Sequence, residues 1–216
     1  MRALVCGVIV GSVAGAATAD TVDIGFEGLS HGALVTTQYS SQGATFSGVT
    51  FGSPSVVTPT GTSYPDAPLA GQSGANYLGP AFGNDYVEIT FDSSIFVTEF
   101  SAVGLDIGEN GFRIEAYDGA TLVDSTQVFG SGFGLDEYYE LSLSVASGFD
   151  RIRIGQAIPF FLFGSPSGST GPFDSAYAID DASYTFVPIP LPPAAWAGLL
   201  GLGLVGGIHG MKRRRA

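Results

Sequence analysis

One alternating stretch near the middle of the chain sets the pattern for its body: Phe112-Arg113-Ile114-Glu115-Ala116-Tyr117-Asp118-Gly119. Successive side chains of a β-strand point to opposite faces of the sheet. The three apolar side chains of this stretch therefore share one face, and the arginine, the glutamate and the tyrosine share the other. Asp118-Gly119 is typical of a tight hairpin turn, which predicts a partner strand over 121–129.

The same kind of sequence continues on both sides of this hairpin. Short runs rich in Val, Ile, Thr, Phe and Tyr alternate with Gly, Ser, Asn and Asp clusters, and no helical periodicity interrupts them. Arg151 and Arg153 are predicted on one face of a strand and Ile152 and Ile154 on the other. The pattern indicates an all-β sandwich or barrel. We expect further strands over 21–26, 34–39, 44–51, 86–91, 95–107, 139–145, 151–154 and 176–186, and a long loop over 59–80.

The chain begins with a pattern typical of a secretory signal peptide. Met1-Arg2 precedes an apolar run over 3–13, and small residues follow up to Ala17 and Ala19, which match an A-x-A cleavage site. We therefore expect signal peptidase, after passage through the Sec machinery, to release a mature protein that begins at Asp20. The only cysteine, Cys6, lies in this segment, so the mature protein can form no disulfide.

The other end has three parts in a fixed order. A proline cluster comes first, and 18 uncharged residues over 194–211 follow, which as a helix would reach roughly 27 Å, about the thickness of a hydrocarbon core. Four basic residues would then hold the end in the cytoplasm. They are Lys212, Arg213, Arg214 and Arg215. The expected segments are a signal peptide (1–19), a β-sandwich body (20–187), a proline-rich linker (188–193), a transmembrane helix (194–211) and a basic stop (212–216).

This order resembles the PEP-CTERM family of bacterial sorting tails, in its VPLPA variant. The residues that carry the resemblance are Pro190, Leu191, Pro192, Pro193 and Ala194. Ile189 stands where the family usually has valine, and Pro193 is an additional proline. The resemblance implies processing by an exosortase, a membrane-embedded cysteine protease, and a body exposed at the cell surface or in the extracellular matrix. A plain C-terminal anchor is the alternative.

The charge of the body restricts its partners. Three arginines stand against all 20 acidic residues of the chain, which leaves the body a net charge of −17. Such a field excludes nucleic acid and repels anionic lipid surfaces. It suits either solubility in a crowded exterior or the capture of divalent cations.

Short motifs at the two ends of the body resemble the jelly-roll carbohydrate-binding modules of the galactose-binding-like class. They include Gly25-Phe26-Glu27-Gly28-Leu29 and Ala178-Ile179-Asp180-Asp181-Ala182. This resemblance implies a jelly-roll-like antiparallel β-sandwich and one structural Ca²⁺, held between Glu27 of the opening strand and Asp180 or Asp181 of the closing strand. Adjacent residues of a strand face opposite sides, so at most one aspartate is expected to point inward. Alternatively, these acids cap backbone N–H groups at a solvated strand end.

A sugar site requires a flat aromatic ring together with amide or carboxylate groups. The loop over 59–80 offers both, in Tyr64, Asp66, Asn76 and Tyr77. The mature body has a single histidine, His31, no cysteine and no nucleophile-elbow motif, which argues against catalysis.

The sequence as a whole predicts an exported, non-enzymatic protein of the cell surface or extracellular matrix that associates with exopolysaccharide. Its body is expected beyond the inner membrane, and its C-terminus in the cytoplasm before processing. The alternatives are a structural or adhesive surface protein without a specific sugar site, and a carbohydrate-active enzyme.

Overall fold

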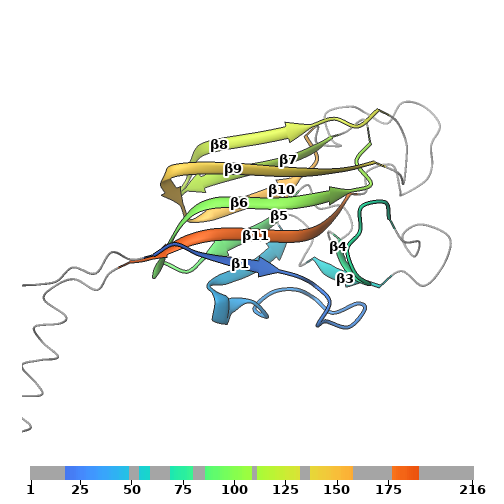
Figure 1. The fold of residues 1–216 in the computed structure, drawn as a ribbon, viewed down its shortest axis with the longest axis horizontal. Helices are drawn as coiled ribbons and strands as arrows, with labels where there is room; N and C mark the ends of the chain where they lie inside the picture. The colour runs from blue at the N-terminus through green and yellow to red at the C-terminus, as the bar shows by residue number, and fades with distance from the viewer. Residues whose placement is uncertain are drawn as a thin grey trace, which may run out of the picture. The chain divides into compact units, whose positions relative to one another are not determined.

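The structure, a computed structural model, describes residues 18–48, 54–58, 69–79, 86–108, 111–131, 137–157 and 177–189. In this part of the chain the regular structure consists of eleven strands and one 3-10 turn, and every strand pair is antiparallel. The strands form two sheets (Figure 1). The prediction of an all-β antiparallel sandwich is therefore confirmed.

Several predicted features lie outside the described residues. These are the signal segment up to Ala17, the loop residues Tyr64 and Asp66, the sorting motif over 190–194, the span over 194–211 and the basic stop over 212–216. Ala19 is described and exposed, one residue before the first strand. Among the described residues, no helix has the length and apolar character needed to cross a membrane.

The six-stranded sheet is built around the last strand of the body, β11. In spatial order it contains β3 (Ser55–Val57), β4 (Tyr77–Gly79), β11 (Ala178–Pro188), β6 (Ile95–Leu105) and β9 (Tyr138–Phe149). The sixth strand, β1 (Asp20–Ile24), also pairs with β11, on the edge that β4 uses, so that Asp20 lies opposite Phe186. The first and last strands of the body are thus neighbours, as Figure 1 shows.

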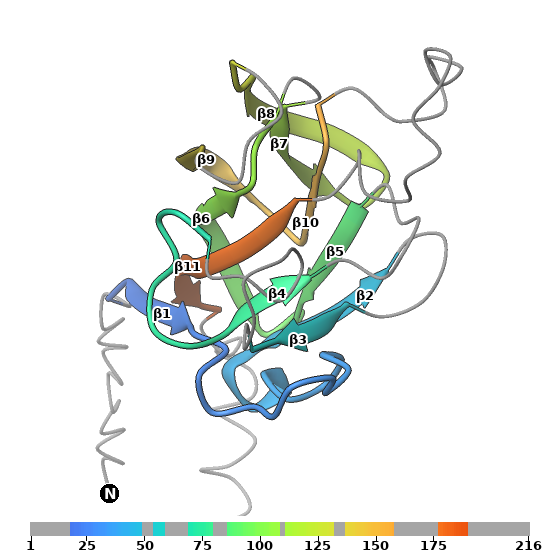
Figure 2. The ribbon, with the colours of Figure 1, turned by 90° about the vertical axis from the view of Figure 1, so that its right-hand side faces the viewer.

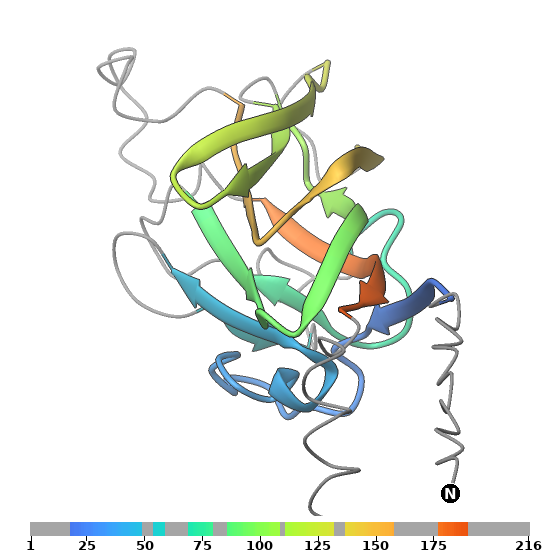
Figure 3. The ribbon, with the colours of Figure 1, turned by 90° about the vertical axis from the view of Figure 1, so that its left-hand side faces the viewer.

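The five-stranded sheet contains the hairpin predicted around Asp118-Gly119. Gly119 has a φ of +57°, which glycine adopts readily in a tight turn. The spatial order is β2 (Ala44–Gly48), β5 (Tyr86–Phe91), β10 (Arg151–Gly155), β7 (Phe112–Asp118) and β8 (Thr121–Val128). In the two end-on views the sheets lie on opposite sides of the core (Figure 2, Figure 3).

The core lies between the two sheets and is made by alternate residues of each strand. Phe91 of β5 packs against Tyr184 of β11, with ring centroids 4.9 Å apart. Phe112 of β7 is fully buried and lies over Gly104 of β6, where a Cβ atom would come within 2.6 Å of its ring. Glycine is therefore required at position 104 by a close approach of the sheets rather than by backbone conformation.

The strand predicted over 34–39 is wrong. Leu34 makes only an isolated bridge to Ser55 and is exposed. The side-chain amide of Gln38 donates to the carbonyl of Leu34 (2.6 Å) and accepts from the backbone N–H of Thr36 (2.6 Å). These local bonds replace a β-ladder and turn the chain toward the 3-10 turn Ser40–Gln42.

Candidate functional site

The outer face of the five-stranded sheet gathers all three arginines of the body. Val87, Ile89, Ile114, Ala116, Ile152 and Ile154 point into the core and are fully buried, so their neighbours along the strands face outward. We call this surface the arginine face. Its residues are Tyr86, Glu88, Arg113, Glu115, Tyr117, Arg151 and Arg153.

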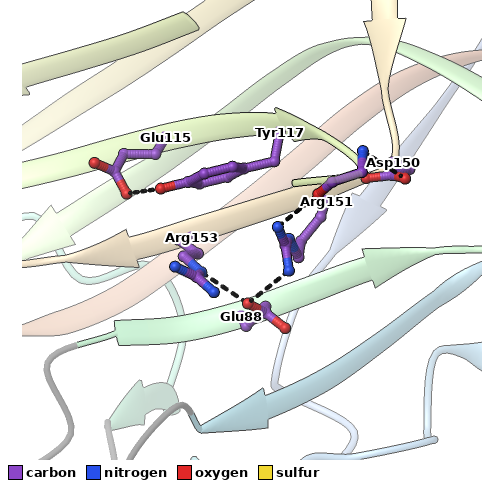
Figure 4. Close-up of polar contacts among 7 residues, drawn as sticks. Glu88, Glu115, Tyr117, Asp150, Arg151 and Arg153 are labelled. Atoms are coloured by element: carbon purple, nitrogen blue, oxygen red, sulfur yellow. Dashed lines mark hydrogen bonds and ion pairs between the residues drawn. The ribbon is translucent and has the colours of Figure 1, made fainter. Parts of the chain in front are cut away.

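Ion pairs join the charged side chains of the arginine face (Figure 4). Glu88 accepts a hydrogen bond from Nε of Arg153 (2.8 Å), and its Oε2 lies 3.6 Å from Nη1 of Arg151. Arg113 pairs with Glu115, with Nη2 and Oε1 2.7 Å apart. The ion pairs of Glu88 thereby link β5 to β10, whereas the pair of Arg113 and Glu115 lies within β7, and each glutamate has at least one guanidinium partner.

The two tyrosines complete the network. Both Arg151 and Arg153 lie over the ring of Tyr117, 4.8 and 5.0 Å from its centroid. The hydroxyl of Tyr117 donates to Oε2 of Glu115 (2.8 Å), as Figure 4 shows. Burial raises the pKa of Tyr117, and its hydrogen bond to Glu115 raises it further. Arg113 lies over the ring of Tyr86 and donates to its hydroxyl.

The residues of the arginine face are half-buried, except Glu115, which is buried. The three arginine side chains are 23–28% exposed, and Glu115 is 6% exposed. Two guanidinium atoms, Nε of Arg113 and Nε of Arg151, are buried and have no hydrogen-bond partner in the described part of the structure. Buried donors of this kind require an explanation such as a water or a ligand. The face therefore offers planar groups and hydrogen-bonding capacity on a rigid sheet.

The sequence predicted the orientation of these residues but did not mark them as a site. Arg113, Glu115 and Tyr117 face away from the core as expected, and so do Arg151 and Arg153. The signal that was available is simple: the body has only three cations, and all three occupy outward positions of strands that alternate.

A second group of polar side chains holds the loop before β4. Glu27 accepts hydrogen bonds from the backbone N–H of Ala75 (3.0 Å) and of Asn76 (2.9 Å). Asp180 accepts from the N–H of Ser73 (2.6 Å), and Asp181 accepts from the Ser73 hydroxyl (2.7 Å). The three predicted calcium ligands therefore meet the same short loop, over 73–76.

Asp180 points inward and Asp181 outward, as the strand alternation predicted. Asp180 is 1% exposed, whereas Asp181 is exposed and has a positive φ of 42° at an irregularity in β11. Burial raises the pKa of Asp180 to about 6, although the N–H of Ser73 favours its charged form. The irregularity lets both aspartates contact Ser73.

In this arrangement the three acids accept hydrogen bonds from the loop over 73–76. Calcium requires six to eight oxygen ligands. The groups directed at Glu27 and Asp180 are backbone N–H donors, which would repel a cation. Within the described ranges no three acidic, histidine or cysteine side chains come together as metal ligands. The geometry matches the alternative in which the acids cap N–H groups, and calcium stays a prediction.

The two described residues of the predicted sugar loop are core residues. Tyr77 is 1% exposed and Asn76 is 5% exposed. The amide of Asn76 donates to the carbonyls of Phe26 (3.1 Å) and Leu29 (3.0 Å) and accepts from the hydroxyl of Thr58. Burial of both side chains argues against direct contact with a sugar. Segment 73–76 is bound to Glu27 and Asp180, which holds it against the core, and a sugar contact of the loop stays a prediction.

Asp106, at the end of β6, gives a pH-dependent contribution to stability. Burial raises its pKa to about 6 from an ordinary value of 3.8. Its contribution to stability is thus fully present below pH 3.8 and is lost as the pH rises through about 6. Asp106→Asn keeps a residue that tolerates the positive φ of 58° and removes the buried charge.

We expect Asp106→Asn to stabilise the protein at pH 7.5 by about 1 kcal/mol, after discounting for solvent screening. This is a rise in Tm of roughly 2–4 °C. The gain should disappear near pH 4, where Asp106 is protonated. Thermal unfolding of Asp106→Asn at both pH values measures this gain in Tm. The control is Asp124→Asn, at an exposed position. An equal shift at both pH values would contradict it.

No family model matches the chain, and no curated protein does. The family 29 carbohydrate-binding module CBM29_1 from Piromyces equi is 14% identical, covers 66% of this chain and 90% of its own, and has a TM-score of 0.29. The K3 cleaved adhesin domain of Lys-gingipain from Porphyromonas gingivalis w83 is 11% identical, covers 72% of this chain and 98% of its own, and has a TM-score of 0.35.

A third similar structure is the enzymatically active domain of tailspike protein 4 from bacteriophage CBA120. It is 16% identical, covers 70% of this chain and 20% of its own, and has a TM-score of 0.30. Because all three TM-scores are below 0.5, no function is transferred to this chain from these proteins.

Proposed function

We propose that this chain is an exported, non-enzymatic protein of the cell surface or extracellular matrix, and that it binds polysaccharide through the arginine face. The observation that carries the proposal is the arrangement of three guanidinium groups, two carboxylates and two tyrosine rings on one rigid sheet. Sugars are recognised by such planar groups with directed hydrogen bonds.

The arrangement of the carboxylates favours binding over hydrolysis. A glycosidase requires one carboxyl group that donates a proton and a second that acts as base or nucleophile. Glu88 and Glu115 both accept hydrogen bonds from arginine or tyrosine and are held by ion pairs. These contacts occupy both glutamates in holding neighbouring side chains.

The delivery of the body is proposed from the sequence. The signal peptide would direct export through the Sec machinery, and the PEP-CTERM-like tail would be a substrate of an exosortase. The body would then be attached to, or released from, the outer side of the inner membrane. A jelly-roll arrangement of the sandwich and a structural Ca²⁺ belong to the same proposal.

One observation favours a second function, a structural or adhesive protein without a specific sugar site. The two glutamates of the arginine face already have partners within the face, so the network could serve only to hold β5, β10 and β7 together. A test must therefore separate binding from stability.

The test is a double substitution, Arg113→Gln/Arg153→Gln, in the purified full-length chain. We expect retention on immobilised polysaccharide from the host's own extracellular matrix to fall at least tenfold, because both guanidinium forks are removed. Far-UV circular dichroism should keep its β-sheet spectrum. The matched control is Glu99→Gln, an exposed position on the outer face of the other sheet. Unchanged retention in the double variant would favour the structural alternative.

A further inference from the structure

The strand registers place the outward residues of the five-stranded sheet in straight rows. Ser47 lies opposite Glu88, Glu88 opposite Arg153, Arg153 opposite Glu115, and Glu115 opposite Ser125. Neighbouring strands are about 4.8 Å apart, so this row extends over roughly 19 Å. It presents, in order, a hydroxyl, a carboxylate, a guanidinium, a carboxylate and a hydroxyl. The next row contains Thr45, Thr90, Arg151, Tyr117 and Leu122.

We infer that the ligand of the arginine face is an uncharged, hydroxyl-rich polysaccharide that lies across the strands, along these rows. The inference rests on the proposed function and names the chemical class of its ligand. Each hydroxyl group of such a chain can donate and accept a hydrogen bond. It therefore matches a row in which donors and acceptors alternate, with exposed Ser47 and Ser125 at the two ends.

The pairing of the charged side chains on the face argues against an anionic ligand. Three arginines and two glutamates leave the arginine face with a single net positive charge. A uronate that paired with Arg113 or Arg153 would compete with Glu115 or Glu88 for its guanidinium. Glu115 is only 6% exposed, so if its ion pair with Arg113 were weakened, its carboxylate would remain buried with the Tyr117 hydroxyl as its partner and without a cation, which is costly.

Charge on the rest of the body acts in the same direction. The body carries a net charge of −17, so a polyanion is repelled as it approaches within a Debye length, about 8–10 Å at physiological ionic strength. A polycation would be attracted to the body as a whole, but it would meet guanidinium groups on this face. An uncharged chain avoids both costs.

Binding to three kinds of polymer tests the inference. The full-length chain is tested by affinity electrophoresis against a panel of neutral glucans, mannans and galactans, against alginate as polyuronate, and against chitosan as polycation. We expect binding to at least one neutral polymer, at least tenfold tighter than to alginate, and changed less than twofold between 50 and 500 mM NaCl. Attraction of opposite charges weakens with salt, whereas hydrogen bonding to a neutral chain does not depend on it.

Two sets of variants locate the binding. Ser47→Ala/Ser125→Ala removes the exposed hydroxyls at the ends of the row and should weaken neutral binding several-fold without changing Tm. Ser142→Ala/Ser144→Ala, two exposed serines on β9 of the other sheet, is the matched control and should change nothing. Glu88→Gln releases two arginines and should increase binding to alginate.

The outcomes separate this inference from the proposed function. Alginate bound more tightly than every neutral polymer, with affinity that falls as salt rises, would overturn the neutral class and leave polysaccharide binding intact. An equal loss of neutral-polymer binding in the Ser47/Ser125 and Ser142/Ser144 variants would overturn the placement of the polysaccharide along the row. Absence of binding to all three kinds of polymer would overturn the proposed function itself.

Discussion

Replacing Asn76 by aspartate is expected to lower the free energy of unfolding by about 4 kcal/mol. The amide of Asn76 is buried and donates to two backbone carbonyls, those of Phe26 and Leu29. A carboxylate of the same shape offers no donor, so both carbonyls lose a partner at about 1–3 kcal/mol each, and a charge is placed beside them. For a body of this size, the change corresponds to a fall in Tm of roughly 10 °C.

The same experiment decides what Asn76 does. Thermal or urea unfolding of Asn76→Asp should be compared with that of Gln127→Ala, which removes an exposed amide from β8 and should leave Tm unchanged. If Asn76 were a sugar contact, as the sequence suggested, its substitution would reduce binding and spare Tm. A stable Asn76→Asp protein would therefore refute the structural role.

Gly104→Val is expected to destabilise the body by about 2–3 kcal/mol. In an ordinary strand, replacing glycine by a residue with a Cβ is favourable by roughly 0.5–1 kcal/mol, because less backbone entropy is lost on folding. At position 104 the substitution is instead destabilising, because a Cβ would lie 2.6 Å from the fully buried ring of Phe112 on the opposite sheet. Overpacking of this kind forces either the ring or the sheets to move.

A double-mutant cycle identifies the cause. Phe112→Leu should destabilise the Gly104→Val variant less than it destabilises the wild type, which gives a favourable coupling energy between the two sites. Glu99→Val, on the exposed side of the same strand, controls for the added side chain. Additive effects of the two substitutions would show that the clash does not explain the loss.

Strand alternation predicted the parts of the fold that depend on local sequence. The strand Tyr86–Phe91 has the predicted bounds, and the hairpin at Asp118-Gly119 joins the predicted strands within one or two residues. In these segments apolar and polar residues alternate without interruption, and the burial of one face follows directly.

Features that depend on distant residues could not be predicted in this way. The strands Ser55–Val57 and Tyr77–Gly79 are too short to show alternation, and they exist because they pair with each other and with β11. The contact between Glu27 and the backbone of Asn76 joins residues 49 positions apart. Predicting the arginine face would have required the register of β5, β10 and β7, and no local sequence pattern contains that register.

The position of β11 has a mechanical consequence. The chain leaves the body through this strand, and the strand has hydrogen-bonded neighbours on both edges, β6 on one and β1 with β4 on the other. A pull on residue 189 therefore loads two ladders at once, in the interior of the sheet instead of at its margin. Extracting this strand would split the six-stranded sheet through its middle, so the body resists tension at the very point where a tether would attach.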